Sequence, residues 1–192
     1  MPLPQAARIN DTVAVGTNPQ AYGKIGMIWL PLWSWRLVAS NDVPLIAVAS
    51  GNGGQLASDT APKLIRVNTS TDKKMTLNWA ASSSIEIMND FAYPPDLDDT
   101  QPLWVNIQVK SDGATDTPTL TVGYFEGIGD TNAGSATAAI SSTLSQKVVT
   151  IAASDVGAYP NAASVTITPG AHTTDTVVVT NTWITYVRKL GL

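Results

Sequence analysis

Few side chains in this chain of 192 residues have the types that enzymes use for chemistry. There is one histidine, His172, which lies in "PGAHTTD", and there is no cysteine. A zinc site built from the usual three or four histidine and cysteine ligands therefore cannot form within one chain. A Ser-His-Asp arrangement would also need His172, and no G-x-S-x-G motif supplies its nucleophile. The residue types argue against both chemistries.

Carboxylates are the remaining candidates for catalysis. Glycoside hydrolysis needs a pair of them at a suitable separation. Glu86 and Glu126 are the two glutamates of the chain. Glu86 falls on the polar face of a short predicted strand, and Glu126 falls at a strand end. A sugar-binding cleft would also need exposed aromatic side chains near both. We therefore predict that the protein is not an enzyme and has no catalytic or cofactor-binding residues.

The segment "PPDLDDTQP" is the best candidate for binding a cation. Asp96, Asp98 and Asp99 could offer oxygen ligands to calcium, with backbone carbonyls completing the shell. The segment lacks the glycine and the final glutamate of an EF-hand loop. An acidic turn between prolines is more often a solvated loop, so we predict no metal site and leave cation binding by these three residues open.

The segment "EGIGDTNAG", residues 126–134, is rich in glycine and follows the predicted strand "TLTVGYF". A dinucleotide fingerprint needs G-x-G-x-x-G at the start of a helix, and here the third glycine, Gly134, comes two places late. A P-loop needs Lys-Ser or Lys-Thr after its glycines, and neither is present. We interpret the segment as part of a connection of about twenty residues, and loops of that length are often functional. We expect it to contact another subunit.

The elements that must position these residues are strands. "LWVNIQVK" alternates apolar and polar residues, as do "KMTLNWA", "SIEIM", "TLTVGYFE", "KVVTIAA" and "ASVTITPG". The longest strand candidate is "DTVVVTNTWITYVRK". "KLIRVN" and "VPLIAVAS" also have strand character. We interpret "LWVNIQVK" and "TLTVGYFE" as a hairpin with a long loop. In "SDVGAYP", Ser154 or Asp155 is predicted to cap one helical turn that Pro160 ends. The chain is therefore predicted to be all-β and antiparallel.

The N-terminal region differs from the rest. Residues 1–40 have little apolar periodicity, yet Trp29, Trp33 and Trp35 fall within seven residues. We predict an extended arm over residues 1–42 and a β-sandwich domain over residues 43–192. The tryptophans could cover the protein's own sandwich or lie on a neighbouring subunit, and we take them as candidate subunit or partner contacts.

Charge and hydropathy exclude two classes of partner. The net charge is −4, and there is no stripe of lysine and arginine to neutralise phosphates, so we expect no nucleic acid partner. The most apolar run, "IGMIWLPLWSWRLVAS", is interrupted by Pro31 and Arg36. It is shorter than the roughly 20 apolar residues that span a bilayer, so we expect no membrane partner. We also expect no secretory signal in "MPLPQAARIN".

Residues 100–190 resemble the C-terminal part of jelly-roll virion proteins of tailed bacteriophages. The likeness rests on "LWVNIQVKSDGATDTPTLTVGYFEG", on "SDVGAYPNAASVTITPGAHTTDTVVVTNTWITYVRK" and on their order. The matching positions are Tyr159, Pro160, Pro169, Gly170, His172, Asp175, Trp183 and Tyr186. None of them is catalytic.

The resemblance implies a jelly-roll β-sandwich that acts as a capsid cement or decoration protein on the virion surface. It further implies a homotrimer that binds the major capsid protein and stabilises the head without catalysis. The alternative is a receptor- or glycan-binding module of a virion fibre or spike, and a third hypothesis is a free carbohydrate-binding β-sandwich or glycosidase. Under the cement hypothesis, deleting residues 1–40 should leave a folded sandwich that no longer attaches to capsids.

Overall fold

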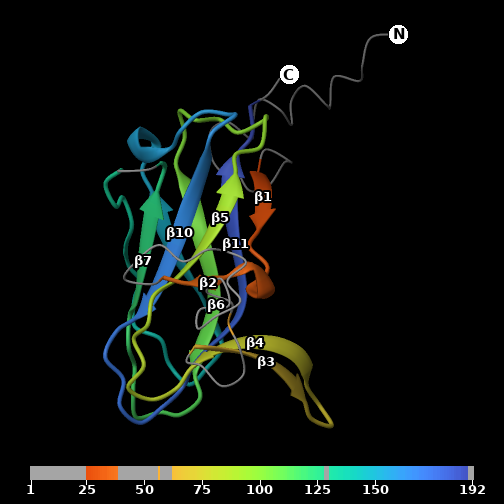
Figure 1. Ribbon diagram of the computed structural model, residues 1–192, viewed down its shortest axis with the longest axis vertical. Coiled ribbons are helices and arrows are strands. Elements are labelled where there is room, and N and C mark those ends of the chain that lie inside the picture. The colour runs from red at the N-terminus through yellow and green to blue at the C-terminus, as the bar shows by residue number, and fades with distance from the viewer. Residues whose placement is uncertain (1–24, 39–55, 57–61, 128–129, 190–192) are drawn as a thin grey trace, which may run out of the picture.

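The computed structural model describes residues 25–38, 56, 62–127 and 130–189 (Figure 1). Their regular structure is almost entirely strands, with single 3₁₀ turns at η2 (Leu32–Ser34) and η4 (Ala153–Asp155). The strands are β1 (Ile25–Trp29), β2 (Arg36–Leu37), β3 (Lys63–Asn68), β4 (Lys73–Trp79), β5 (Ile87–Ala92), β6 (Leu103–Ser111), β7 (Leu120–Phe125), β8 (Ser135–Ala136), β9 (Ser145–Ile151), β10 (Ala162–Pro169) and β11 (Val177–Val187). No helix among the described residues is long and apolar enough to cross a membrane.

The strands form two antiparallel sheets that face each other across one core. Sheet A has the order β3-β4-β11-β6-β9, and β1 also pairs with β11. Sheet B has the order β2-β5-β10-β7-β8. The eight strands from β4 to β11 thus make two four-stranded sheets, β4-β11-β6-β9 and β5-β10-β7-β8. This order is that of a jelly roll, and it confirms the predicted all-β sandwich.

The period-two pattern places the predicted residues in the core. Side chains of β6, β7, β9, β10 and β11 that alternate along each strand are almost fully buried between the sheets. They include Leu103, Val105, Ile107, Val109, Leu120, Val122, Tyr124, Val149, Ile151, Val165, Ile167, Val177, Val179 and Ile184. Burying each large aliphatic side chain contributes about 1.5–3 kcal/mol to folding, so these rows supply most of the driving force.

Three local predictions differ from the structure. β6 and β7 are not a hairpin, because β6 pairs with β11 and β9 in sheet A whereas β7 pairs with β10 and β8 in sheet B. The strand expected at "SIEIM" begins at Ile87, and Ile85 is exposed. The turn η4 is capped by Ala152 without a side-chain hydrogen bond, and not by Ser154 or Asp155. The strand predicted at "VPLIAVAS" and the domain boundary at residue 42 lie outside the described residues.

The described part of the predicted arm, residues 25–37, runs from one sheet to the other, and we call it the crossing segment. Its strand β1 pairs with residues 183–187 of β11, beyond the part of β11 that pairs with β4, and its strand β2 pairs with β5. Between these strands Leu30, Leu32 and Trp35 are buried in the core. The crossing segment therefore closes one open side of the sandwich, so deleting residues 1–40 would remove part of the core.

Thr182 of β11 fixes the crossing segment at its centre. The indole Nε1 of Trp35 donates a hydrogen bond of 3.1 Å to Thr182 Oγ1, which itself donates to the carbonyl of Leu30. The amide of Leu30 donates to the carbonyl of Thr182 at 3.1 Å. All three residues are buried, so each polar group depends on the others for its partner.

Replacing Thr182 by valine should destabilise the fold without changing its shape. The variant leaves the indole Nε1 of Trp35 and the carbonyl of Leu30 buried without partners, a loss of about 1–3 kcal/mol for each unsatisfied group. Urea unfolding followed by tryptophan fluorescence measures it. Thr121→Val on the exposed face of β7 is the matched control and should change the free energy of unfolding little. Equal stability of the two variants would show that the crossing segment is not anchored at Thr182.

Candidate functional site

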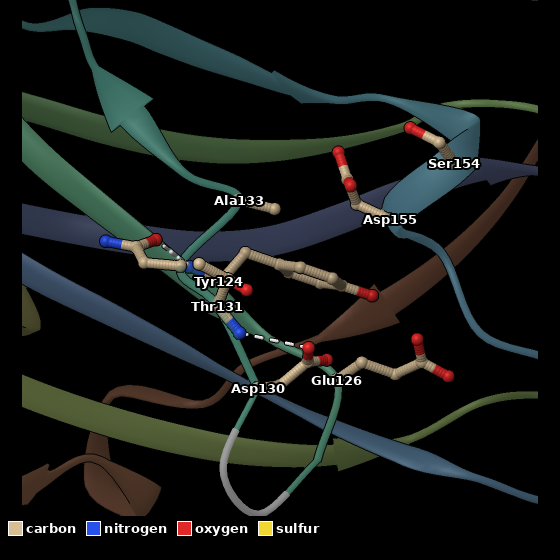
Figure 2. Close-up of a pocket in the computed structure, with 8 residues that line it drawn as sticks. Tyr124, Glu126, Asp130, Thr131, Ala133, Ser154 and Asp155 are labelled. Carbon is tan, nitrogen blue, oxygen red and sulfur yellow. Dashed lines mark hydrogen bonds between the residues drawn. The ribbon is translucent and has the colours of Figure 1, made fainter.

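The glycine-rich segment "EGIGDTNAG" borders a cleft of about 400 Å³ beside sheet B (Figure 2). Its lining comes from β7, from the loop that follows and from η4: Tyr124, Glu126, Asp130, Thr131, Asn132, Ala133, Ser154 and Asp155. Three of these side chains are carboxylates, which repel phosphate. In Figure 2 the ring of Tyr124 lies between Asp155 on one side and Asp130 and Glu126 on the other. The cleft is polar and acidic, but its carboxylates do not converge on one point.

Hydrogen bonds and close contacts give the residues of this loop structural roles. Asn132 Oδ1 accepts from the amides of Tyr124 at 3.0 Å and Gly134 at 2.8 Å. A Cβ atom at Gly134 would lie 1.8 Å from the carbonyl oxygen of Val122, so this glycine is required by the close approach of two backbones. Glu126 lies against Gly157, where a Cβ atom would come within 1.7 Å of Glu126 Oε1. The glutamate therefore packs on the connection that leads to β10.

Tyr124 and Tyr93 share a buried hydrogen bond between their hydroxyl groups, and the amide of Gly157 donates to Tyr93 at 3.2 Å. Burial and the neighbouring tyrosine raise the pKa of Tyr124 well above its usual range, and burial raises that of Tyr93. Both groups remain protonated at physiological pH. They act as a polar contact inside the core and supply neither an acid nor a base to the cleft.

The three aspartates of the cation candidate are paired with other groups of the protein. Asp96 binds Arg188 and accepts from the hydroxyl of Tyr186 at 2.8 Å, Asp99 pairs with Lys189 at 2.9 Å, and Asp98 accepts from Thr100. Despite partial desolvation, these partners lower the pKa of Asp96. Among the described residues no group of three or more histidine and acidic side chains is arranged to hold a metal ion. These carboxylates fasten the end of β11 to the loop before β6.

His172 and Asp175, from the segment that resembles virion proteins, hold loops together. Both ring nitrogens of the buried His172 face backbone carbonyls, that of Gly170 at 2.9 Å and that of Ala80 at 3.1 Å. Asp175 accepts from the amides of residues 115 and 116, and Asp116 accepts from the amides of residues 173, 174 and 175. This reciprocal pair joins the β6–β7 and β10–β11 connections.

The predicted contact tryptophans are in three different environments. Trp35 is buried in the protein's own core as part of the crossing segment. Trp33, on η2, is 62% exposed, and Trp29, on β1, is 58% exposed. Trp29 and Trp33 therefore remain available to a partner, whereas Trp35 does not.

Trp29 belongs to a larger group of side chains that the sequence did not indicate. On the outer face of sheet A, register places Trp29 beside Trp183 and, in the next row, Met27 beside Thr185 and Trp104. The rings of Trp29 and Trp183 are 6.1 Å apart at 49°. At the positions of β6 and β9 that pair with these rows, most of the side chains carry amides or hydroxyls. We call this surface the tryptophan–amide face; it comprises Met27, Trp29, Trp104, Asn106, Gln108, Gln146, Val148, Thr150, Asn181, Trp183 and Thr185.

The polar groups of the tryptophan–amide face are held by one another. Asn106 Nδ2 donates to Thr185 Oγ1 at 3.1 Å, and Gln146 Nε2 donates to Asn106 Oδ1 at 2.7 Å. Gln108 Oε1 accepts from Asn181 Nδ2 at 3.2 Å. The face contains no charged residue, although Met27, Trp29 and Val148 are each about half exposed. It is a preformed, uncharged surface of aromatic rings and amides.

Comparisons with known proteins give no family. No family model matches the chain, and no curated protein matches it. Among solved structures, the xylan-binding module CBM15 is 15% identical over 86% of this chain and 97% of its own, with a TM-score of 0.48. TmCBM61 in complex with β-1,4-galactotriose is 10% identical over 66% of this chain and 81% of its own, with a TM-score of 0.44. A family 30 carbohydrate-binding module of Clostridium thermocellum is 9% identical over 68% and 84%, with a TM-score of 0.40. With TM-scores below 0.5 these likenesses carry no argument, and the fold assignment rests on the strand order.

Neutralising Asp116 should weaken the fold in a pH-dependent way. Amide hydrogen bonds from Asp175, Thr174 and Thr173 lower the pKa of Asp116 below its usual value of about 3.9. A depressed pKa stabilises the folded state above about pH 4, and this stabilisation is lost as the pH falls through the folded pKa. Asp116→Asn should therefore lower the urea midpoint at pH 7 and differ less from the parent protein near pH 3.

Glu86→Gln is the matched control, because Glu86 makes no side-chain hydrogen bond to another described residue. It should leave both midpoints unchanged. An Asp116→Asn variant as stable as the parent at pH 7 would contradict the structural role of the reciprocal pair.

Proposed function

We propose that the protein is a non-catalytic binding module whose tryptophan–amide face binds an oligosaccharide. The observation that carries the proposal is the composition of that face: three tryptophans beside amides and hydroxyls, with no charge. It favours the glycan-binding alternative over the capsid cement hypothesis.

The chemistry of the face suits a polyhydroxylated ligand. A sugar ring presents apolar C–H groups on its flat sides and hydroxyls at its edges. The tryptophan rings offer broad apolar surfaces to the former. The amides of Gln108 and Gln146 can donate and accept, as hydroxyls require, and the buried Asn106 holds Gln146 in place. Because these amides are already held in place, little conformational entropy is lost on binding.

The dimensions of the face suit a chain of sugars rather than a single ring. The face crosses β1, β11, β6 and β9, and neighbouring strands are about 4.8 Å apart, so it is about 14 Å wide. Trp29 and Trp183 lie at one side, and Val148 and Gln146 lie at the other. A ligand that contacts all four strands must be extended.

The same composition supports a role without catalysis. Glycoside hydrolysis needs two carboxyl groups beside the bound sugar, and the tryptophan–amide face has none. The acidic cleft lies outside that face, on loops beside sheet B, and Glu126 there packs against Gly157.

The head-binding role implied by the virion resemblance remains a prediction. Exposed tryptophans also occur in protein interfaces, where aromatic residues dominate the binding energy. Stoichiometric binding to isolated capsids by a stable homotrimer would favour that role.

Loss of a tryptophan from the face should abolish glycan binding. A glycan array identifies the ligand, and isothermal titration calorimetry then compares variants. Trp183→Ala and Trp29→Ala should each weaken binding about tenfold or more, because each removes one of the paired aromatic rings of the face. Trp33→Ala is the matched control, since Trp33 is equally exposed but lies on η2, and it should bind like the parent.

Circular dichroism of each variant checks that the sandwich remains folded. The absence of binding across a broad array would contradict the proposal. Equal losses in all three variants would show that the tryptophan–amide face is not the binding surface.

A further inference from the structure

A hollow of about 310 Å³ continues the outer face of sheet A beyond the tryptophan–amide face. It lies between the β3–β4 hairpin, which projects from the lower end of the sandwich in Figure 1, and the adjacent parts of β11 and β6. We call it the basic hollow; it is lined by Val67, Asp72, Lys74, Thr76, Lys110, Leu144 and Thr180.

The charge of the basic hollow contrasts with that of the chain. Lys74 and Lys110 outweigh its one acid, Asp72, in a protein whose net charge is −4. The salt bridges among the described residues, Arg188–Asp96 and Lys189–Asp99, involve neither lysine. Asp72 accepts a hydrogen bond from its neighbour Thr71 at 3.2 Å and belongs to the β3–β4 turn. The hollow therefore presents two cations, neither of which forms a salt bridge among the described residues, beside one carboxylate.

The basic hollow and the tryptophan–amide face are continuous. Lys110 is the next outward-facing residue of β6 after Gln108, and Thr180 Oγ1 donates to Gln108 Oε1 at 3.1 Å. Along β11, Thr180 lies three residues from Trp183, a distance of about 10 Å along a strand. An extended ligand that stacks on Trp183 and follows the strands toward the amides reaches the hollow.

We propose that the ligand is an acidic oligosaccharide whose carboxylate or sulfate group is bound by Lys74 and Lys110. The inference rests on the proposed function and deepens it, since it adds the charge class of the ligand. A lysine ammonium is a compact charge with three hydrogen-bond donors on a flexible side chain. It therefore suits a single anionic group of the ligand. The uncharged part of the face holds the sugar rings, and the hollow selects for the acid.

Matched pairs of ligands test the charge class. One pair is tetragalacturonate and its methyl ester, and the other is sulfated cellotetraose and cellotetraose. The acidic member of the preferred pair should bind about two- to thirtyfold more tightly than its neutral partner, the range expected for two exposed ion pairs. This preference should fall as salt is added. The pair that shows it distinguishes a carboxylate from a sulfate ester.

Charge variants locate the anion. Lys74→Gln combined with Lys110→Gln should remove the preference for the acid and leave binding of the neutral partner unchanged. Lys73→Gln combined with Lys147→Gln removes the same charge from the opposite face of sheet A, because Lys73 is in phase with the buried Leu77 and Trp79 of β4 and Lys147 pairs with the buried Ile107. This control should keep the preference. Equal binding of both members of each pair, or equal effects of both double variants, would overturn the inference while leaving glycan binding intact.

A titration without sugar separates this inference from the proposed function. Sodium sulfate and sodium acetate, added at constant ionic strength against sodium chloride, should shift the backbone amide resonances of Thr76 and Thr180 in the full chain. The shifts should disappear in the Lys74→Gln/Lys110→Gln variant. If neither anion shifts them, the anion site is disproved whatever the glycan array shows. If they shift but no oligosaccharide binds, the anion site stands and the proposed function fails.

Discussion

The hydroxyl of Thr182 is the contact that holds the crossing segment to β11 and to the core. A jelly roll has an open side wherever an edge strand does not extend the full length of its neighbour, and here β4 pairs with only three residues of β11. The crossing segment fills the remainder with β1 and inserts Leu30 and Trp35 into the core. Thr182 accepts from one of these residues and donates to the other, so a single side chain joins the N-terminal region, the core and β11. The position of Trp29 on the outer face follows from that anchor.

Much of the fold could be predicted from the sequence, because burial on one face gives a period of two that needs no knowledge of partners. Leu103, Val105 and Ile107 are buried as their alternation indicates. The pattern does not say which strands pair. The alternation in a strand's sequence is the same whether the next strand of the chain joins the same sheet or the opposite one. The hairpin expected from β6 and β7 was wrong for that reason. The chain crosses from sheet A to sheet B in the β6–β7 connection. That connection is held by hydrogen bonds of Asp116 and Asp175, which are far apart in the sequence.

The candidate site was less predictable than the fold. The signal present in the sequence was that Trp104 and Trp183 occupy the polar phase of their strands, where an exposed aromatic residue needs an explanation. Joining them to Trp29 required the register of three strands. The three clustered tryptophans of the N-terminal region looked alike in the sequence, yet one is core and two are surface, because the crossing segment turns at η2. Lys74 and Lys110 gave no signal at all, since they meet only when β4 and β6 flank β11.

The irregularity in β11 determines which of the later side chains of this strand face outward. The register of β11 against β6 shifts between Val179 and Asn181, so one residue is accommodated without a partner. Beyond that point Thr182, Ile184 and Tyr186 face inward, and Trp183 and Thr185 face outward. An unbroken alternation from Val177 and Val179 would place Trp183 inside, and the extra residue places it outside. A deletion that removes only the extra residue would restore a regular ladder and leave Trp183 on the outer face, so this stretch of β11 can lose one residue without exchanging its two faces.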